Sequence, residues 1–346
     1  MTVTSIREVA KAAGTSSATV SRVLNHDASF SVSSETATRV WTTAERLGYL
    51  KPSPLSQTIQ IVTTQTHAME INDPYFRAIR LALEGQVTQQ QLKIGTTIRI
   101  NQQTSLPSLQ PLAKCGGVIV IGGFTQQALQ KLAALNHNLV VIDDPYLPPM
   151  LDGVYADLFG FTQRLVTQLY QHFLGPIAFV GGRRAVTELN GKQVVDDQEV
   201  RYQAYLQATK AAKQPALAYL EGWAAQSGEA AAAWFLQQKS RPKVVVVASD
   251  PLAIGFIHRL FGQLTPQEFP KVVSFDDSEM AAYTTPSLSS VKIPVTLFGI
   301  NAIRLLSEKM AGTREFATRV VLEPKLIYRD SLLATDTVSN EGQAKA

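Results

Sequence analysis

The sequence predicts a small all-α head followed by a large α/β body made of two doubly wound, parallel-sheet lobes. Residues 1–48 carry apolar side chains at helical spacing. From residue 59 the pattern changes to short runs rich in Val and Ile, with longer helical segments between most of them. Alternating strands and helices favour right-handed crossovers and parallel sheets covered on both faces. The body has roughly 265 residues, more than one sheet comfortably holds, so two similar lobes are expected.

The head begins with two short helices joined by a tight turn. Ser5 and Glu8 have the spacing of a capping box, which satisfies the first amide donors of a helix. Gly14 can adopt the left-handed geometry that ends this helix, and Ser16 can cap the next one. Because such a short turn makes the helices cross steeply, the second helix is expected to keep an outward face that packs against nothing.

A third helix and a linker complete the N-terminal region. Residues 33–48 repeat apolar side chains at helical spacing and end in glycine. The predicted head therefore spans residues 1–48. Residues 49–58 form the linker, because Pro52 and Pro54 prevent a regular helix from running through it.

The predicted strands and helices alternate along the body. The strand-like runs are IQIVTT, LKIGTTIRI, GGVIVIGG, LVVIDD, IAFVGG, VVVVAS and VVSFDD. Helical spacing is clearest over residues 74–91 and 160–172.

Composition and charge are those of a globular protein with a weakly basic head. Apolar residues make up 45% of the chain and charged residues 17%, which argues against extensive disorder. A net charge of +4 and a pI near 9.0 mildly favour a nucleic-acid partner. Residues 1–60 hold six Lys and Arg against four Asp and Glu, so specific contacts must carry much of any DNA binding.

The motifs of common enzyme classes are absent from the sequence. It has no glycine fingerprint for dinucleotides, no P-loop and no nucleophile elbow. Paired carboxylates also hydrolyse glycosides, but these absences argue against an enzyme. The five histidines lack metal-ligand spacing, and the single cysteine, Cys115, is expected to be a buried structural thiol. No cofactor and no metal are expected.

The sequence shows no segment that resembles a signal peptide or a membrane span. Its longest aliphatic runs reach about five residues, whereas a membrane span needs roughly 20. We therefore expect a cytoplasmic protein with no membrane partner. The same absence, together with the head, disfavours a transport binding protein.

The segment ATVSRVLN, residues 18–25, follows an alanine-glycine turn at residues 12–14. Over about twenty consecutive positions, this region closely resembles the head of the lac repressor/gal repressor (LacI/GalR) family of bacterial transcription regulators. The resemblance implies a helix-turn-helix whose second helix lies in the major groove of operator DNA. It favours a repressor over the alternative of a helix pair with an ordinary solvated face.

The resemblance also implies roles for individual residues of the head. Arg22 is the best candidate for guanine contact, and Asn25 for a phosphate or base contact. Ser17 and Ala18 occupy the positions that select the operator in the family, and this small pair suggests a gal-like half-site. The candidates for phosphate contact are the hydroxyls of Ser16, Thr19 and Ser21.

The linker has two alternative interpretations. In the family, a hinge helix forms on DNA here and inserts a leucine into the minor groove. Leu55 is the candidate, in a helix that would start after Pro54. A plain tether with a partly buried leucine is the alternative.

The resemblance continues through almost the whole body and implies a fold of the periplasmic-sugar-binding type. The first lobe would take about residues 59–157 and 294–325, and the second about 158–287. The body would end at residue 331. A polar tail, residues 332–346, lacks the leucine heptads that form tetramers in some relatives, so a homodimer is expected.

The carboxyl ends of the predicted strands carry the candidate effector site, because ligands of open parallel sheets bind there. Carboxylates, an arginine and aromatic rings suit a sugar, whose hydroxyls pair with charged groups and whose C–H faces lie on rings. By position in matching motifs, the candidates are Asp73 and Phe76 in the first lobe and Arg201, Trp223, Asp250 and Asp276 in the second. Two alternatives stay open: Asp250 may cap the following helix, and Trp223 may be ordinary core.

The expected effector is a small molecule bound between the lobes. The stretch INDPYF resembles family members that regulate galactose and β-galactoside use, so a galactoside is the first choice. The alternatives are a phosphosugar, with Arg183 and Arg201 as the anion site, or a nucleobase corepressor stacked on Tyr75 and Phe76. Effector binding is expected to change the relative orientation of the lobes, and hence the spacing of two heads on a roughly palindromic operator.

Overall fold

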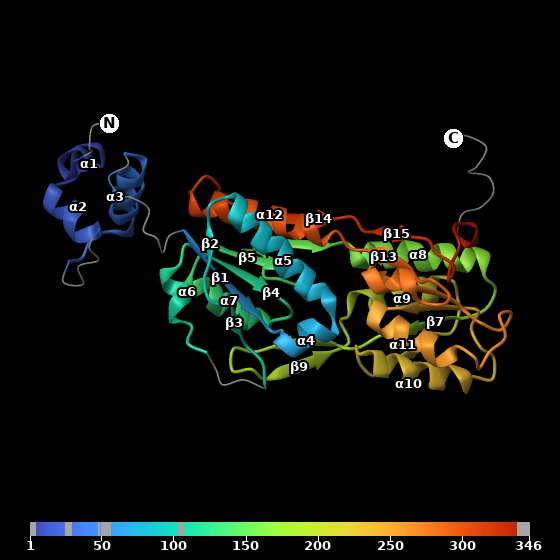
Figure 1. The fold of residues 1–346 in the computed structure, drawn as a ribbon. Coiled ribbons are helices and arrows are strands. Elements are labelled where there is room, and N and C mark those ends of the chain that lie inside the picture. Colours follow the sequence, from blue (N-terminus) through green and yellow to red (C-terminus); the bar gives the residue numbers. More distant parts are fainter. Residues whose placement is uncertain (1–4, 25–29, 48, 50–56, 103–106, 338–346) are drawn as a thin grey trace, which may run out of the picture.

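The computed structural model describes residues 5–24, 30–47, 49, 57–102 and 107–337 of the chain. Three helices form the head, and two mostly parallel sheets with helices on both faces form the body (Figure 1). The fold class predicted from the sequence is thus confirmed. No helix among these residues is long and apolar enough to cross a membrane.

The head consists of α1 (Ile6–Ala12), α2 (Ser17–Leu24) and α3 (Ser34–Arg46). The predicted capping box is present, since the Ser5 amide donates to Glu8 Oε2 at 2.6 Å and the Glu8 amide donates back to Ser5 Oγ at 3.4 Å. Gly14 has φ +63°, as its position in the turn requires. The head has a core of its own, made of Val9, Ala10, Ala13, Val20, Val23, Val40 and Ala44.

The first lobe is built on a sheet of seven parallel strands. Their order is β14–β6–β5–β4–β1–β2, with β3 also paired to β1. The strands are β1 (Thr58–Thr63), β2 (Lys93–Ile94), β3 (Ile98–Arg99), β4 (Gly117–Ile121), β5 (Leu139–Ile142), β6 (Asp152–Ala156) and β14 (Arg319–Leu322). Side chains on alternate faces of β4 enter different cores, with Ile119 on one side and Val118 on the other.

Helices cover both faces of this first sheet. One face packs against α5 (Pro74–Gln89) and α12 (Val295–Met310), which lie side by side in Figure 1. The other face packs against α6 (Gln110–Lys114) and α7 (Gln126–Leu135). A short helix, α4 (His67–Asn72), follows β1.

The second lobe contains a six-stranded sheet in the order β10–β7–β11–β12–β13–β15. The strands are β7 (Ile177–Val180), β10 (Leu217–Tyr219), β11 (Val244–Val247), β12 (Lys271–Asp276), β13 (Ser289–Lys292) and β15 (Lys325–Ile327), of which only β15 is antiparallel. The helices are α8 (Leu158–His172), α9 (Val200–Ala211), α10 (Ala225–Leu236) and α11 (Asp250–Leu260), and η1 (Glu279–Tyr283) is a 3-10 turn. A separate hairpin pairs β8 (Arg184–Thr187) with β9 (Gln193–Asp196).

The chain passes between the lobes three times. It enters the second lobe after β6, returns to the first after β13, and leaves again between β14 and β15. The second sheet therefore includes two strands that lie outside the predicted range of residues 158–287. Antiparallel pairing of Ser290 with Ile327 joins these two strands.

The body extends beyond residue 331, where the polar tail was expected to begin. Leu332 is fully buried, and η2 (Ala334–Asp336) follows it. Asp336 pairs with Lys271 at 3.0 Å, and Thr337 is buried beside the Tyr328 hydroxyl at 2.5 Å. Residues 332–337 are therefore part of the packed body, and the expected tail boundary was wrong.

Candidate functional site

The outward face of α2 carries the residues predicted to read DNA. Val20 and Val23 of this helix are buried against α1 and α3. Ala18 and Arg22 are exposed, and Ser17 is partly exposed beside them. Helical geometry thus separates the packing face from a polar face, as the predicted recognition helix requires.

The hydroxyls at the start of α2 also shape the helix. Ser16 Oγ accepts a hydrogen bond from the Thr19 amide at 3.0 Å and lies 2.9 Å from Thr19 Oγ1, so Ser16 is the cap predicted from the sequence. Ser21 is partly exposed one turn further on. The Arg22 guanidinium lies 5.3 Å from the centre of the Phe30 ring. Asn25 and Leu55 lie outside the described residues.

In the body, acidic and aromatic side chains of the first lobe meet a buried arginine of the second. We call this set the interlobe cluster, and its members are Asp73, Tyr75, Asp143, Arg201, Trp223 and Asp276. They come from the carboxyl ends of β5, β10 and β12 and from the starts of α5 and α9. Burial raises the pKa of both Asp73 and Asp143, and the positive charge of Arg201 opposes that rise, so charges of the two lobes lie within electrostatic reach of each other.

Arg201 is held rigidly in the second lobe. Its Nε donates to Glu199 Oε1 at 2.7 Å, and its Nη1 donates to the Ala248 carbonyl at 2.6 Å. The guanidinium also lies 5.1 Å from the Trp223 ring and 5.5 Å from the Phe275 ring. Burial lowers the pKa of Arg201, but Glu199 and the nearby aspartates outweigh burial and raise it. Its Nη2 donates no hydrogen bond to a described residue, so this nitrogen can serve a ligand.

Trp223 packs against the core of the second lobe and is positioned by a neighbouring glycine. Its Nε1 donates to the Arg183 carbonyl at 3.2 Å. A Cβ at Gly182 would lie 2.3 Å from Nε1, so only glycine leaves room for the indole here. Gly182, just after β7, thus makes space for this ring.

The first-lobe side of the cluster is formed by the start of α5 and the end of β5. Asp73 caps α5 by accepting from the Tyr75 amide at 3.0 Å. The Tyr75 hydroxyl is buried beside Asp143 and has no hydrogen-bond partner of good geometry among the described residues. Burial raises the pKa of Asp143 to about 7, although Tyr75 and Arg201 each act to lower it. Of these three residues, the sequence pattern selects Asp73 as a sugar contact and offers Tyr75 only for stacking a nucleobase, and Asp143 is not among its chosen effector contacts.

Asp276 and its neighbour Asp277 point in different directions, as expected for adjacent residues. Asp276 has φ +109° and lies in the cluster, where burial, Asp250 and Asp73 raise its pKa well above the usual range. Asp277 accepts from Arg329 Nη2 at 2.7 Å and turns toward β13 and β15. Asp276 is therefore the member of the pair that can meet a ligand.

Both carboxylate oxygens of Asp250 accept hydrogen bonds from neighbouring serines, so its predicted effector contact has little structural support. Its Oδ1 accepts from Ser274 and Ser290, and its Oδ2 accepts from the Ser278 amide at 2.6 Å. The side chain is fully buried at the start of α11. The preceding Ser249 has a buried hydroxyl without a hydrogen-bond partner in the described structure, and is the better candidate at this strand end.

Phe76 packs in the first lobe instead of joining the cluster. Its ring meets Tyr75 edge-on, with centroids 5.2 Å apart, and lies against the core under α5. Tyr75, its neighbour, is the aromatic residue that reaches the cluster, and sequence spacing alone cannot distinguish the two.

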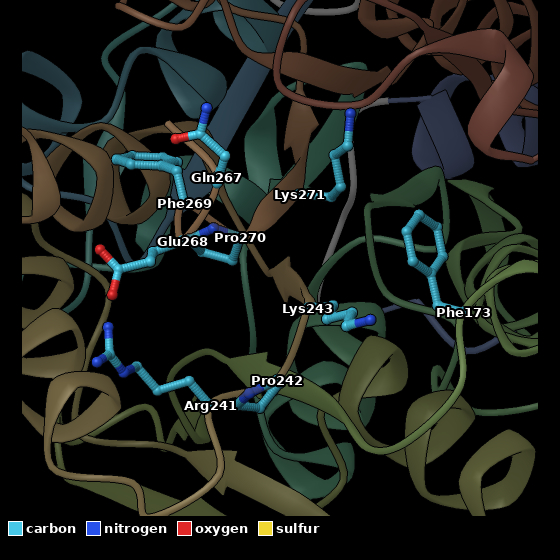
Figure 2. Close-up of a pocket in the computed structure, with 9 residues that line it drawn as sticks. All are labelled: Phe173, Arg241, Pro242, Lys243, Gln267, Glu268, Phe269, Pro270 and Lys271. Atoms are coloured by element: carbon cyan, nitrogen blue, oxygen red, sulfur yellow. The ribbon is translucent and has the colours of Figure 1, made fainter. Parts of the chain in front are cut away.

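A hollow lies at the amino end of the second sheet, away from the interlobe cluster. Figure 2 shows it between Lys243, just before β11, and Lys271, the first residue of β12. Arg241 and Glu268 face each other across one side, and Phe173 stands at the other. These are the amino ends of the strands, away from the carboxyl ends where ligands of parallel sheets bind, so we do not assign the effector to this hollow.

The described residues contain no group of His, Cys, Asp and Glu that could hold a metal ion. The Cys115 thiol is half-buried, and its Sγ lies 3.3 Å from the Leu112 carbonyl and 3.2 Å from that of Gly117. Burial raises its pKa, as expected for a structural thiol.

Comparison with known proteins finds matches along the whole chain. The family model described as "Bacterial regulatory proteins, lacI family" matches residues 5–52, and that described as "Periplasmic binding protein-like domain" matches residues 167–332. The "HTH-type transcriptional regulator GalR" of Lacticaseibacillus casei is 28% identical over 341 residues, covering 95% of this chain and 100% of the relative. The "HTH-type transcriptional repressor PurR" of Actinobacillus pleuropneumoniae serotype 5b is 24% identical over 344 residues, covering 94% and 98%.

Solved structures share the fold. A "transcriptional regulator CelR-cellobiose complex" has a TM-score of 0.66 at 23% identity, covering 95% of this chain and 99% of that one. A lac repressor dimer bound to operator and the anti-inducer ONPF has a TM-score of 0.65 at 20% identity, covering 96% and 100%. The relatives are transcriptional regulators rather than enzymes, in agreement with the prediction from the sequence.

Proposed function

We propose that a neutral sugar bound at the interlobe cluster controls the affinity of this chain for an operator, since its head matches the lacI family model and its relatives are transcriptional regulators. As a DNA-binding transcriptional regulator, it would act as a repressor of a sugar-utilisation operon in the bacterial cytoplasm. Arg22, Ser17 and Ala18 would read the major groove from α2.

The observation that carries this proposal is the meeting of both lobes around Arg201. Carboxylates from the first lobe and Asp276 from the second can accept hydrogen bonds from hydroxyls. The free Nη2 of Arg201 can donate one, and Trp223 offers a ring face for C–H groups. A polyhydroxylated ring therefore fits both the polar and the apolar parts of the cluster.

The charge of the cluster favours a neutral sugar over a phosphosugar. Asp73, Asp143 and Asp276 face one arginine, which is already paired with Glu199 at 2.7 Å. Arg183, the other proposed anion-binding residue, is exposed and paired with Asp197 at 3.5 Å. A phosphate would lie beside three acidic side chains and a single arginine that is already paired, so little positive charge would compensate it.

A nucleobase is supported only by the relatives named PurR. A base needs stacking on both of its faces. Tyr75 and Phe76 meet edge-on instead of forming two parallel walls, and the Arg201 guanidinium already lies over the Trp223 ring. Relatives named GalR make galactose or a galactoside the first choice.

We also propose a homodimer, which would present two heads to the half-sites of a palindromic operator. Exposed apolar side chains in both lobes offer surface that a second copy can cover. These are Ile71 and Leu81 in the first lobe and Met280 and Tyr283 in the second.

Thermal unfolding of the full chain with a panel of sugars tests the effector class. Galactose or a galactoside at a hundred times its Kd should raise Tm by about 5 °C, since binding to the folded state alone stabilises it. Arg201→Gln should lose this rise. Arg183→Gln is the matched control, because it removes an exposed arginine that pairs within the second lobe.

The sugar proposal fails if purines or sugar phosphates raise Tm and no neutral sugar does. The site assignment fails if Arg201→Gln responds to the active sugar as fully as Arg183→Gln does. Circular dichroism of both variants checks that the fold is retained.

A further inference from the structure

The β8–β9 hairpin, residues 184–196, connects the two lobes. It leaves the second lobe after β7 and returns to it just before α9. Its strands pair with each other from Arg184 with Asp196 to Thr187 with Gln193, and with no strand of the second sheet. We call these residues the interlobe hairpin.

The outer part of the interlobe hairpin is anchored in the first lobe. The Thr187 amide donates to the Gly123 carbonyl at 2.9 Å, and the Thr125 amide donates to the Thr187 carbonyl at 3.1 Å. A Cβ at Gly123 would lie 2.7 Å from the Ala185 carbonyl oxygen, so the backbones approach closely. Leu189 packs against the first-lobe core. The hairpin is therefore held to the first lobe both by backbone hydrogen bonds and by the packing of an apolar side chain.

Arg184 adds an ion pair between the lobes. Its Nη1 pairs with Asp196 Oδ2 at 2.9 Å within the hairpin, and its Nη2 lies 3.7 Å from Oδ1 of Asp144 in the first lobe. The guanidinium also lies 4.8 Å from the Tyr146 ring. Asp144 is almost fully buried, so screening of this pair by solvent is weak.

The base of the interlobe hairpin holds the second-lobe half of the effector site. The carbonyl of Arg183, the residue before β8, accepts the hydrogen bond from Trp223. Glu199, three residues after β9, caps α9 by accepting from the Tyr202 amide at 2.8 Å and pairs with Arg201. A displacement of the hairpin relative to the second lobe therefore moves the groups that orient Trp223 and Arg201.

We propose that the interlobe hairpin couples the effector-binding groups of the second lobe to the position of the first lobe, with Arg184 and Leu189 as the positioning residues. A ligand that draws Arg201 and Trp223 inward shifts the base of the hairpin, and its anchored end transmits this shift to Gly123–Thr125 and Asp144. The role of this coupling in the effector response rests on the proposed function. The contacts that join the hairpin to both lobes are present without a ligand.

Hydrogen–deuterium exchange of the full chain without sugar tests the link. Arg184→Gln and Leu189→Ala should each accelerate amide exchange on the order of threefold in residues 123–129 of the first lobe and 199–206 of the second. Lys192→Gln is the matched control, since it removes a positive charge from an exposed position of the same hairpin and should leave both segments unchanged. Acceleration confined to residues 184–196 in both variants would overturn the proposal.

A second measurement adds galactose to the same four proteins. In the unsubstituted protein and in Lys192→Gln, exchange should slow in both segments, whereas in Arg184→Gln it should slow only in residues 199–206. Slowing of residues 123–129 in Arg184→Gln equal to that in Lys192→Gln would contradict the coupling. If galactose slows exchange nowhere, the choice of galactose fails, and the sugar-free experiment still decides on the hairpin.

Discussion

Three aspartates near the effector site adopt a backbone geometry that non-glycine residues rarely take. The φ angles are +65° at Asp143, +109° at Asp276 and +52° at Asp277. Such residues persist only where the surrounding structure fixes them, and they concentrate at functional sites. Here they lie at the ends of β5 and β12, where the turns bring the Asp143 and Asp276 carboxyl groups to the interlobe cluster, whereas Asp277 pairs with Arg329.

The raised pKa of Asp143 predicts a pH dependence of stability. Its pKa is about 7 in the folded protein against 3.8 in the unfolded chain, so the folded state binds the proton more tightly. The resulting stabilisation is complete below about pH 4 and is lost as pH rises through 7. The free energy of unfolding of Asp143→Asn should therefore fall less between pH 5.5 and 8 than that of the unsubstituted protein.

Urea denaturation at several pH values measures this difference. Asp197→Asn, a substitution of an exposed aspartate, is the control and should follow the unsubstituted protein. If the free energy of unfolding depends on pH in the same way in Asp143→Asn and Asp197→Asn, the protonation of Asp143 does not cause the loss of stability.

At the scale of elements, one buried ion pair fixes the return of the chain to the first lobe. Asp152, the first residue of β6, is fully buried and accepts from Arg314 Nη1 at 2.8 Å and Nη2 at 2.7 Å. Arg314 lies between α12 and β14, so the pair ties that connection to the sheet. The Thr318 amide, just before β14, donates to the same carboxylate at 2.6 Å.

Removing Arg314 should destabilise the protein far more than removing a neighbouring surface arginine. Arg314→Ala leaves a buried carboxylate without its main partner, which should cost about 3 kcal/mol of unfolding free energy. Arg304→Ala breaks an exposed pair with Glu308 in α12 and should cost less than about 1 kcal/mol. Equal losses in urea denaturation would contradict the role assigned to Arg314.

Elements with a strong local pattern could be predicted from the sequence, and those fixed by distant contacts could not. The helices of the head and the Val- and Ile-rich strands follow from caps and apolar runs. The β9 strand was missed because Val194 and Val195 are exposed, so it has no buried face to mark it. The run RVVLEPKLIYR, residues 319–329, predicts one final strand, but the structure divides it into β14 and β15, because β15 pairs with β13, more than thirty residues earlier in the chain.

The same distinction holds for the site. Motifs at strand ends and helix starts select Arg201, Trp223, Asp73 and Asp276, and their roles as effector contacts stay predictions. The choice between Ser249 and Asp250 depends on hydrogen bonds from Ser274 and Ser290, which lie on other strands. Sequence spacing carries no information about such contacts.

At the scale of the whole molecule, the helices proposed to bind DNA and the groups proposed to bind the effector lie in separate parts of the chain. The head has its own small core, whereas the body joins two sheets through three chain crossings and the interlobe hairpin. A sugar held between the lobes can favour one relative orientation of them. In a homodimer, this orientation sets the distance between two heads, and with it the fit to both half-sites.

The central claim is that the interlobe cluster and the DNA-reading head are coupled. Duplexes selected by the protein from a random pool provide a specific site, and Arg22→Ala should lose specific binding to it. Titration of this duplex with and without saturating sugar measures the coupling directly. We predict a change in DNA affinity of about tenfold, abolished by Arg201→Gln, and an equal change in sugar affinity on adding DNA. The same DNA affinity with and without a bound sugar would contradict the account.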